Sequence, residues 1–160
     1  MRARRGRASW RGARRPVASV LALASSALAL GGCSGLTGSH AHRVAQWAVS
    51  SGVVANDQLV AADVRYVAVG ISRRELVATH TACDGLASDA ASAYGELPSP
   101  DTSLTSSLAR AYLGYSRAAQ DCSDAHSFAS GAFARYDAAA AAAGRALGAA
   151  RGRLAALGVR

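Results

Sequence analysis

Two cysteines and two histidines have the residue types and spacing that could support chemistry in this chain of 160 residues. His80 lies three residues before Cys83, and His126 lies four residues after Cys122. Residues three or four apart share one face of a helix, so each histidine would lie beside its cysteine. Two outcomes suit these side chains: a zinc ion bound by all four, or a disulfide between the cysteines. The elements that carry them, and the compartment of the protein, decide between the two.

Apolar residues at steps of three and four predict those elements to be helices. Four stripes follow one another, and no alternating pattern typical of a strand lies between them. The stripes consist of Val60, Val64, Val67 and Ile71; of Leu76, Thr79, Cys83, Leu86, Ala90, Ala93 and Leu97; of Leu104, Leu108, Ala111, Tyr115, Ala118, Cys122 and Ala125; and of Phe133, Tyr136, Ala140, Ala143, Leu147, Ala150, Leu154 and Leu157. Four amphipathic helices joined by short turns predict an all-α domain over residues 43–160, an antiparallel four-helix bundle.

The sequence signals for the helix boundaries are clear at one place and ambiguous at two others. The stretch "LPSPD" at 97–101 predicts a turn, with Asp101 as the cap of the next helix. Ser72 and Glu75 have the spacing of a capping box, which favours a break there, but residues 53–97 could also form one long kinked helix. Residues 43–52, which include Trp47, either begin the first helix or pack across its end.

Cys83 and Cys122 fall on the apolar stripes of two helices that are neighbours across the proline turn. Counted from that turn at 1.5 Å per residue, the levels of the two cysteines differ by roughly 10 Å. A disulfide therefore requires an asymmetric turn, in which part of "PSPDTSL" runs back along the bundle. The bond would close a loop of about 40 residues and contribute about 2 to 4 kcal/mol.

The first 32 residues have the organisation of a secretory signal peptide, with an arginine-rich start, an apolar run and small residues. The run from Val17 to Leu30 is interrupted by serines and is shorter than the roughly 20 apolar residues of a membrane span. Arg14 and Arg15 leave twin-arginine export open beside the general route, which we favour. An exported protein meets an oxidising compartment, so we expect the Cys83–Cys122 disulfide and keep zinc as the alternative.

The signal peptide ends in Leu30-Gly31-Gly32-Cys33, which resembles the lipobox of bacterial lipoproteins. The resemblance implies cleavage before Cys33, acylation of its thiol, and attachment to the extracytoplasmic face of the cell membrane through buried acyl chains. The alternative is an ordinary cleavage site with an incidental cysteine. Residues 33–42 are rich in Gly and Ser and predict a flexible tether, in which His40 and His42 are only linker residues.

The basic excess belongs to the signal peptide. Seven of the 18 arginines lie before residue 16, every acidic residue lies after residue 56, and the chain from Cys33 onward has 11 arginines against 10 acids. This distribution removes the main support for binding nucleic acid. The arginines at the end of the chain, Arg145, Arg151, Arg153 and Arg160, complement a helix carboxyl terminus or, alternatively, contact lipid headgroups.

No motif for catalysis is present. The chain lacks lysine and has no nucleophile elbow, H-E-x-x-H, P-loop or haem-attachment motif, and neither Glu75 nor Glu96 has a histidine three residues later, as di-iron bundles require. The aspartates lie mostly off the stripes, and Asp63 is the one considered for burial. We therefore expect no enzyme activity and no cofactor.

The mature chain is similar to a group of small secreted or lipid-anchored helical proteins of actinobacteria. The similarity spans about residues 47–147 and is carried by Trp47, "ACDGL" at 82–86, the "LPSPD" turn and "YSRAAQDC" at 115–122. It implies a helical fold, an envelope location and paired cysteines. We expect a lipoprotein that presents a helical bundle to an envelope protein or to the envelope itself. The alternative is a ligand or metal carrier with a cavity lined by Tyr66, Tyr112 or Tyr115.

Overall fold

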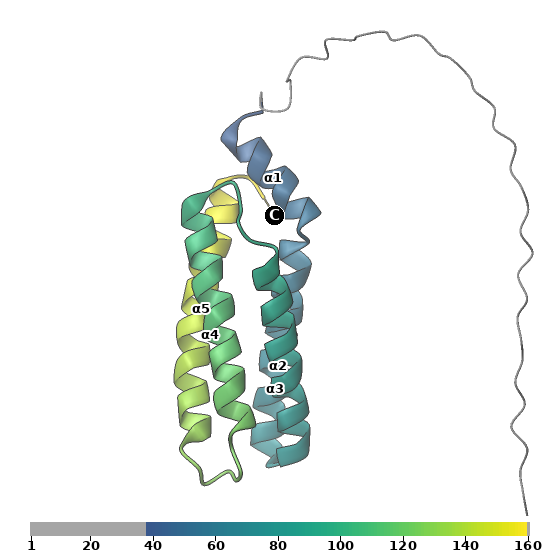
Figure 1. Cartoon of the computed structure of the whole chain (residues 1–160), viewed down its shortest axis with the longest axis vertical. Helices are drawn as coiled ribbons and strands as arrows, with labels where there is room; N and C mark the ends of the chain where they lie inside the picture. The colour runs from purple at the N-terminus through teal and green to yellow at the C-terminus, as the bar shows by residue number, and fades with distance from the viewer. Residues whose placement is uncertain (1–37, 160) are drawn as a thin grey trace, which may run out of the picture. The chain divides into compact units, whose positions relative to one another are not determined.

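The computed structural model describes residues 38–159, and this part of the chain is all-α (Figure 1). It contains five helices rather than the four expected: α1 (His40–Ser50), α2 (Val53–Arg73), α3 (Leu76–Gly95), α4 (Thr102–Ser123) and α5 (Ala132–Ala156). None of the helices within residues 38–159 combines the length and apolar character needed to cross a bilayer. The expected signal peptide, the first half of the expected tether (residues 33–37, with Cys33) and Arg160 lie outside the described residues.

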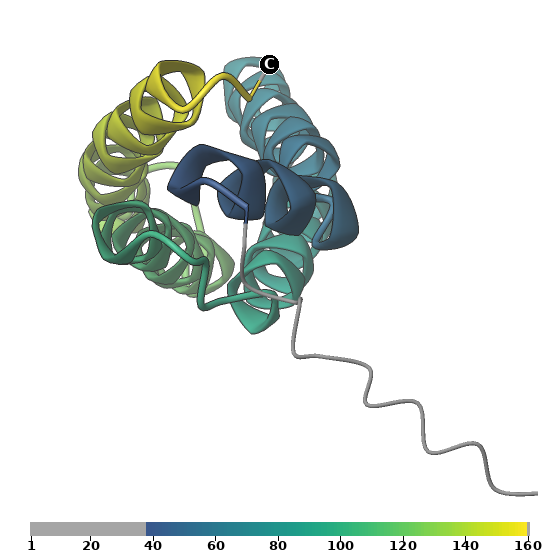
Figure 2. The same cartoon turned by 90° about the horizontal axis from the view of Figure 1, so that it is seen from above.

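The four long helices, α2 to α5, run antiparallel to their chain neighbours and form a bundle (Figure 1). The short helix α1 lies across one end of this bundle, where α2 and α4 begin and α3 and α5 end (Figure 2). Residues 43–52 therefore do not extend the first long helix. Residues 43–50 belong to a separate helix that covers the end of the core, and Ser51 and Gly52 form the turn into α2. Val44 and Ala48, one turn apart, are the α1 side chains buried against it.

The expected tether is too long by three residues. Helix α1 begins at His40, because the Ser39 hydroxyl accepts a hydrogen bond from the backbone N–H of His42 at 3.2 Å. The tether boundary at residue 42 is therefore wrong, and the residues described ahead of α1 are Gly38 and Ser39.

Residues 53–97 contain two helices, not one kinked helix. Arg74 adopts a left-handed conformation with φ 56°, and the N–H groups of Arg74 and Glu75 donate to the carbonyls of Ile71 and Gly70. These two bonds end α2 in a Schellman motif. The break lies where the sequence indicates, but the capping box is not formed, because the Ser72 hydroxyl donates to a carbonyl one turn earlier in α2 and no side chain caps α3.

The four stripes expected from the sequence line the core. Most of their members are buried, and the others are half-buried against them. The largest fully buried side chains are Tyr112, Leu86, Leu104 and Leu108, while alanines fill most of the remaining seam. Small side chains let the helix backbones approach closely, and this is clearest where Gly114 of α4 faces Ala143 of α5.

Replacing Gly114 with valine is expected to lower the free energy of unfolding by about 1 to 3 kcal/mol, because overpacking forces two close helices apart. A Cβ at residue 114 would lie 2.9 Å from the Cβ of Ala143. Urea unfolding followed by circular dichroism measures the change. The matched control is Gly148→Ala in α5, where a Cβ meets nothing within 4 Å and is expected to stabilise the helix. Equal stability of wild type and Gly114→Val would refute close packing at this crossing.

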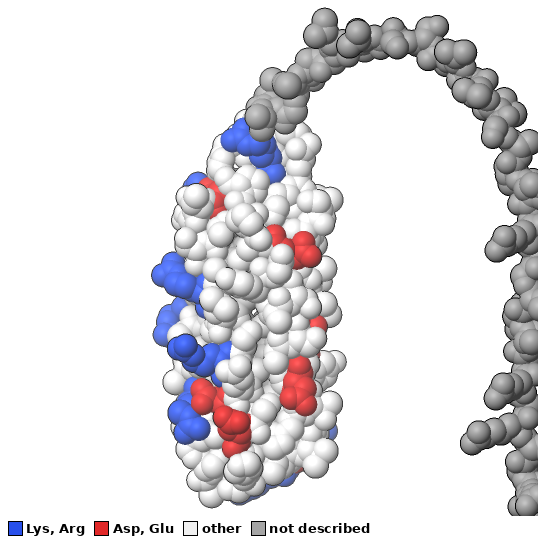
Figure 3. Space-filling view, viewed as in Figure 1, with Lys and Arg blue, Asp and Glu red and all other residues white. Residues whose placement is uncertain are grey.

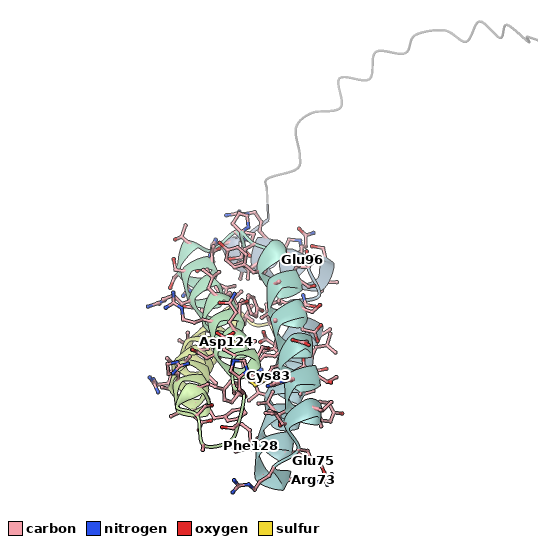
Figure 4. All side chains as sticks on the ribbon, turned by 60° about the horizontal axis from the view of Figure 1, so that its bottom comes forward. Arg73, Glu75, Cys83, Glu96, Asp124 and Phe128 are labelled. Carbon is pink, nitrogen blue, oxygen red and sulfur yellow. A yellow bond between two sulfur atoms is a disulfide. The ribbon has the colours of Figure 1, made fainter. Side chains whose placement is uncertain are left out.

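The end of the bundle opposite α1 is closed by the segment between α4 and α5. Phe128 of this segment stacks on Phe133 with ring centroids 5.1 Å apart, and the Arg74 guanidinium lies 5.7 Å from the Phe128 ring centroid. Figure 4 places Phe128 near the turn between α2 and α3, beside Arg73 and Glu75. The aromatic stack lies within the α4–α5 hairpin, and the cation–π contact of Arg74 with Phe128 joins this hairpin to the α2–α3 hairpin.

Candidate functional site

The two cysteines singled out from the sequence form a disulfide in the core. Cys83 of α3 and Cys122 of α4 are fully buried, with Cα atoms 6.2 Å apart (Figure 4). The difference in level is absorbed by an asymmetric turn, as expected, but in another form. Residues 96–101 continue beyond the end of α3 before α4 begins, rather than running back along the bundle (Figure 1).

The four residues of the zinc alternative do not converge. The imidazole Nε2 of His80 lies 2.9 Å from the Ala125 carbonyl oxygen, to which it donates a hydrogen bond, and His126 is exposed. Within residues 38–159, no three His, Cys, Asp or Glu side chains lie close enough together to hold a metal ion. His80 instead joins α3 to the segment that follows α4.

A buried carboxylate, Asp57, links three helices. Its Oδ1 accepts a hydrogen bond of 2.9 Å from the hydroxyl of Tyr112 in α4, and its Oδ2 accepts one of 3.1 Å from Nε of Arg151 in α5. Burial raises the pKa of Asp57, and the bonds from Tyr112 and Arg151 only partly oppose this rise. Burial likewise raises the pKa of the Tyr112 hydroxyl. The cluster is therefore a structural link whose hydrogen bonds are mutually satisfied.

A second carboxylate, Asp101, links α1, α4 and α5. Its Oδ1 accepts a bond of 2.8 Å from the N–H of Leu104 and so caps α4, as the sequence indicated. Its Oδ2 accepts bonds from Arg153, at 2.6 Å from one guanidinium nitrogen, and from Nε2 of His40 at 3.0 Å. The hydrogen bonds from Arg153 and His40 hold the pKa of Asp101 well below its ordinary value.

These two clusters correct three expectations. His40 is not a linker residue, because it fastens α1 to the start of α4. Arg151 and Arg153 do not merely complement a helix end, because each pairs with a buried carboxylate. Asp57 does not lie off the apolar stripe, and its place four residues after Val53 and three before Val60 was the available signal.

Asp63 of α2 and Asp89 of α3 form a carboxyl pair across the first hairpin. The Oδ2 atom of Asp63 is buried without a hydrogen-bond partner, and the Asp63 carboxyl lies against Gly85 of α3. Burial, together with the neighbouring Asp89 carboxyl, raises the pKa of Asp63 from 3.8 to about 6. Burial of Asp63 was considered from its sequence position but not favoured, and the structure places this residue half-buried.

The bundle is expected to become more stable as the pH falls from 7 to 5. A raised pKa in the folded state means that the stabilisation from protonating Asp63 is complete below about pH 4 and is lost as the pH rises through about 6. Asp63→Asn is expected to raise the urea midpoint at pH 7 and to reduce the gain on acidification. The control Asp137→Asn removes an exposed carboxylate of α5 and should keep the wild-type pH dependence. An unchanged pH dependence in Asp63→Asn would contradict the role of the pair.

The hollows of the bundle are open grooves on its surface. A groove of about 490 Å³ between α2 and α3 is lined by Tyr66 and Asp63, and one of about 380 Å³ is lined by Asp57 and Arg151. Two further grooves, of about 340 and 550 Å³, lie beside α1. Tyr112 and Tyr115 are buried in the core and line none of these four grooves.

Comparisons with models of protein families, with curated proteins and with solved structures find no match to this chain.

Proposed function

We propose that this protein is a lipoprotein of the cell envelope, anchored through an acylated Cys33, whose helical bundle makes non-catalytic contacts with an envelope protein or with the envelope itself. The anchor is supported by the likeness of Leu30-Gly31-Gly32-Cys33 to a lipobox after an apolar run. Each acyl chain stabilises membrane attachment by about 0.8 kcal/mol per buried CH₂, so two or three chains hold the protein firmly.

The observation that carries this proposal is the disulfide between Cys83 and Cys122. Structural disulfides persist in oxidising compartments and are rare in the cytosol. Both sulfur atoms lie in the core, where they join α3 to α4. A bundle cross-linked by a buried disulfide suits a protein that works outside the cytoplasm.

A role in contacts is supported by the uneven charge of the bundle. Figure 3 shows basic side chains in a column over α4 and α5, with acidic side chains beside them in the lower part of the view. Arg110, Arg117 and Arg145 are exposed on these helices, and in the described residues the ion pairs are made by other cations, namely His40, Arg135, Arg151 and Arg153. Such a face favours partners or surfaces that carry negative charge.

Radiolabelled palmitate and fractionation of the native host test the anchor. The wild-type chain is expected to incorporate label and to sediment with membranes, whereas Cys33→Ala should do neither. Mass spectrometry of the mature amino terminus should find an acylated Cys33 as its first residue. A chain in the cytosol with its leader uncut and with free Cys83 and Cys122 thiols would overturn the proposal.

A second candidate function, carriage of a small molecule, is favoured by one groove only. The groove of about 490 Å³ between α2 and α3 has the aromatic ring of Tyr66 and the carboxyl of Asp63 on its walls. This combination suits a small amphipathic molecule with a hydrogen-bonding group. Native mass spectrometry of protein extracted from its membrane tests it, since a bound mass that is lost in Tyr66→Ala is the expected result. The same bound mass on wild type and on Tyr66→Ala, or no bound mass on the wild type, would refute it.

A further inference from the structure

The end of the bundle covered by α1 carries exposed apolar side chains beside charged ones, among them Arg43 of α1 and the exposed Glu96 at the end of α3. We call it the end surface and define it by Trp47 and Val49 of α1, Val54 of α2, and Val159. Val49 has an exposed fraction of 84%, and Val54 has one of 41%. The two grooves beside α1 both include Val49, and neither is lined by an arginine or a carboxylate.

The chain itself places this end near the proposed anchor. Six residues separate Cys33 from the first residue of α1, His40. Fully extended, that stretch spans at most about 25 Å. The opposite end of the bundle lies a further helix length away, about 33 Å for the 22 residues of α4. An acyl anchor at Cys33 therefore holds the end surface, and not the opposite end, within reach of the bilayer.

The chemistry of the end surface suits the boundary between headgroups and acyl chains. Tryptophan prefers this boundary, because its ring is apolar and its N–H is polar. Helix α1 itself contains no acidic residue and one arginine, Arg43. The exposed Glu96 lies beside it, and its backbone carbonyl accepts a hydrogen bond of 3.3 Å from Nε1 of Trp47. A tether of this length keeps the surface at a millimolar effective concentration, so a weak contact is enough.

We propose that the end surface docks onto the membrane that holds Cys33, so that the bundle stands with α1 against the lipid and its opposite end outward. This inference rests on the proposed acylation of Cys33. A lipid surface is favoured over a second copy of the chain, because a stable protein interface buries about 800 Å² on each partner. Two exposed valines and one half-buried tryptophan supply only part of such an area.

Trp47 provides the probe. The chain has two tryptophans, and the other, Trp10, belongs to the expected signal peptide, so emission from the mature protein would come from α1. The lipidated protein is reconstituted into vesicles of phosphatidylcholine and phosphatidylglycerol, with either brominated or ordinary acyl chains. Bromine quenches tryptophan only at short range, so strong quenching of Trp47 in the brominated vesicles is the expected result.

Val49→Asp places a charge in the proposed contact and is expected to reduce this quenching by about half or more. Its matched control is Val77→Asp in α3, at the opposite end, where the wild-type side chain has an exposed fraction of 82%. Val77→Asp should be quenched like the wild type. Both valines are exposed, so both variants are expected to keep the wild-type circular dichroism and urea midpoint.

Other results would overturn the inference in distinguishable ways. Equal emission from brominated and ordinary vesicles that carry the protein would refute the docked end but keep the anchor. Failure of the protein to float with the vesicles would refute the anchor as well. Quenching that is lost in Arg110→Ser/Arg117→Ser but kept in Val49→Asp would mean that the basic face, rather than the end surface, lies on the lipid. Emission that varies with protein density at constant lipid composition would favour self-association.

Discussion

Replacing both Cys83 and Cys122 with alanine is expected to lower the free energy of unfolding by about 4 kcal/mol, the largest effect predicted for this protein. The cysteines are 39 residues apart in sequence, and the disulfide restricts the unfolded chain by closing that loop. Both side chains are fully buried between α3 and α4, so their loss also removes packing from the middle of the core.

Urea unfolding of the wild type with and without a reductant measures the contribution of the disulfide without a substitution. Reduced wild type should unfold near the midpoint of the double variant, and the double variant should not respond to the reductant. A wild type whose midpoint is the same under both conditions would show that the disulfide contributes nothing to stability.

Replacing Asp57 with alanine is expected to lower the free energy of unfolding by about 2 to 4 kcal/mol, because it leaves buried polar groups without partners. The Tyr112 hydroxyl would lose its acceptor inside the core, and the Arg151 guanidinium would lose its carboxylate. The Arg151 side chain is half exposed, so water can replace its lost hydrogen bond. Most of the lost stability is therefore expected to come from Tyr112.

A second variant, Asp57→Asn, separates the hydrogen bond from the charge of Asp57. Its amide oxygen can still accept from Tyr112, and the charge that burial disfavours is removed. Burial raises the pKa of Asp57, which means that ionising this carboxyl costs more free energy in the fold than in the unfolded chain. Asp57→Asn should therefore be at least as stable as wild type at pH 7. Tyr112→Phe, which keeps the ring and loses the hydroxyl, should cost about 1 kcal/mol.

Urea unfolding of the three variants at pH 7 separates the two roles of Asp57. If Asp57→Asn were as unstable as Asp57→Ala, the ion pair with Arg151 rather than the hydrogen bond from Tyr112 would hold the three helices together. If Asp57→Ala were as stable as wild type, the cluster would have no structural role.

The sequence predicted correctly those features that depend on local pattern. The four apolar stripes lie in the core, and Asp101 caps the helix after the proline turn. The sequence favoured a break near Ser72 but left one kinked helix open, and the structure has two helices there. Helix periodicity, turn residues and caps act over a few residues and can therefore be recognised along the chain. The pairing of Cys83 with Cys122 followed from their places on two neighbouring stripes and from the expected compartment.

Other local details could not be predicted because local signals compete. Ser72 and Glu75 have the spacing of a capping box, yet the chain there ends α2 with backbone bonds at Arg74. The Gly and Ser content before residue 43 favoured a tether, but the cap at Ser39 and the bond from His40 to Asp101 extend α1 to residue 40. Composition alone does not reveal a distant partner that stabilises a short helix.

By itself, the sequence determined the helical class, the core faces of the helices and the pair of cysteines between them. The tertiary structure alone decided that α1 crosses the end of the bundle, that Asp57 meets Arg151, and that Asp63 lies beside Asp89. The physical reason is that Asp57 and Arg151 are 94 residues apart, so their meeting depends on the rotation and register of whole helices. Those two quantities are set by how the alanine seams pack together, and no stretch of sequence contains them.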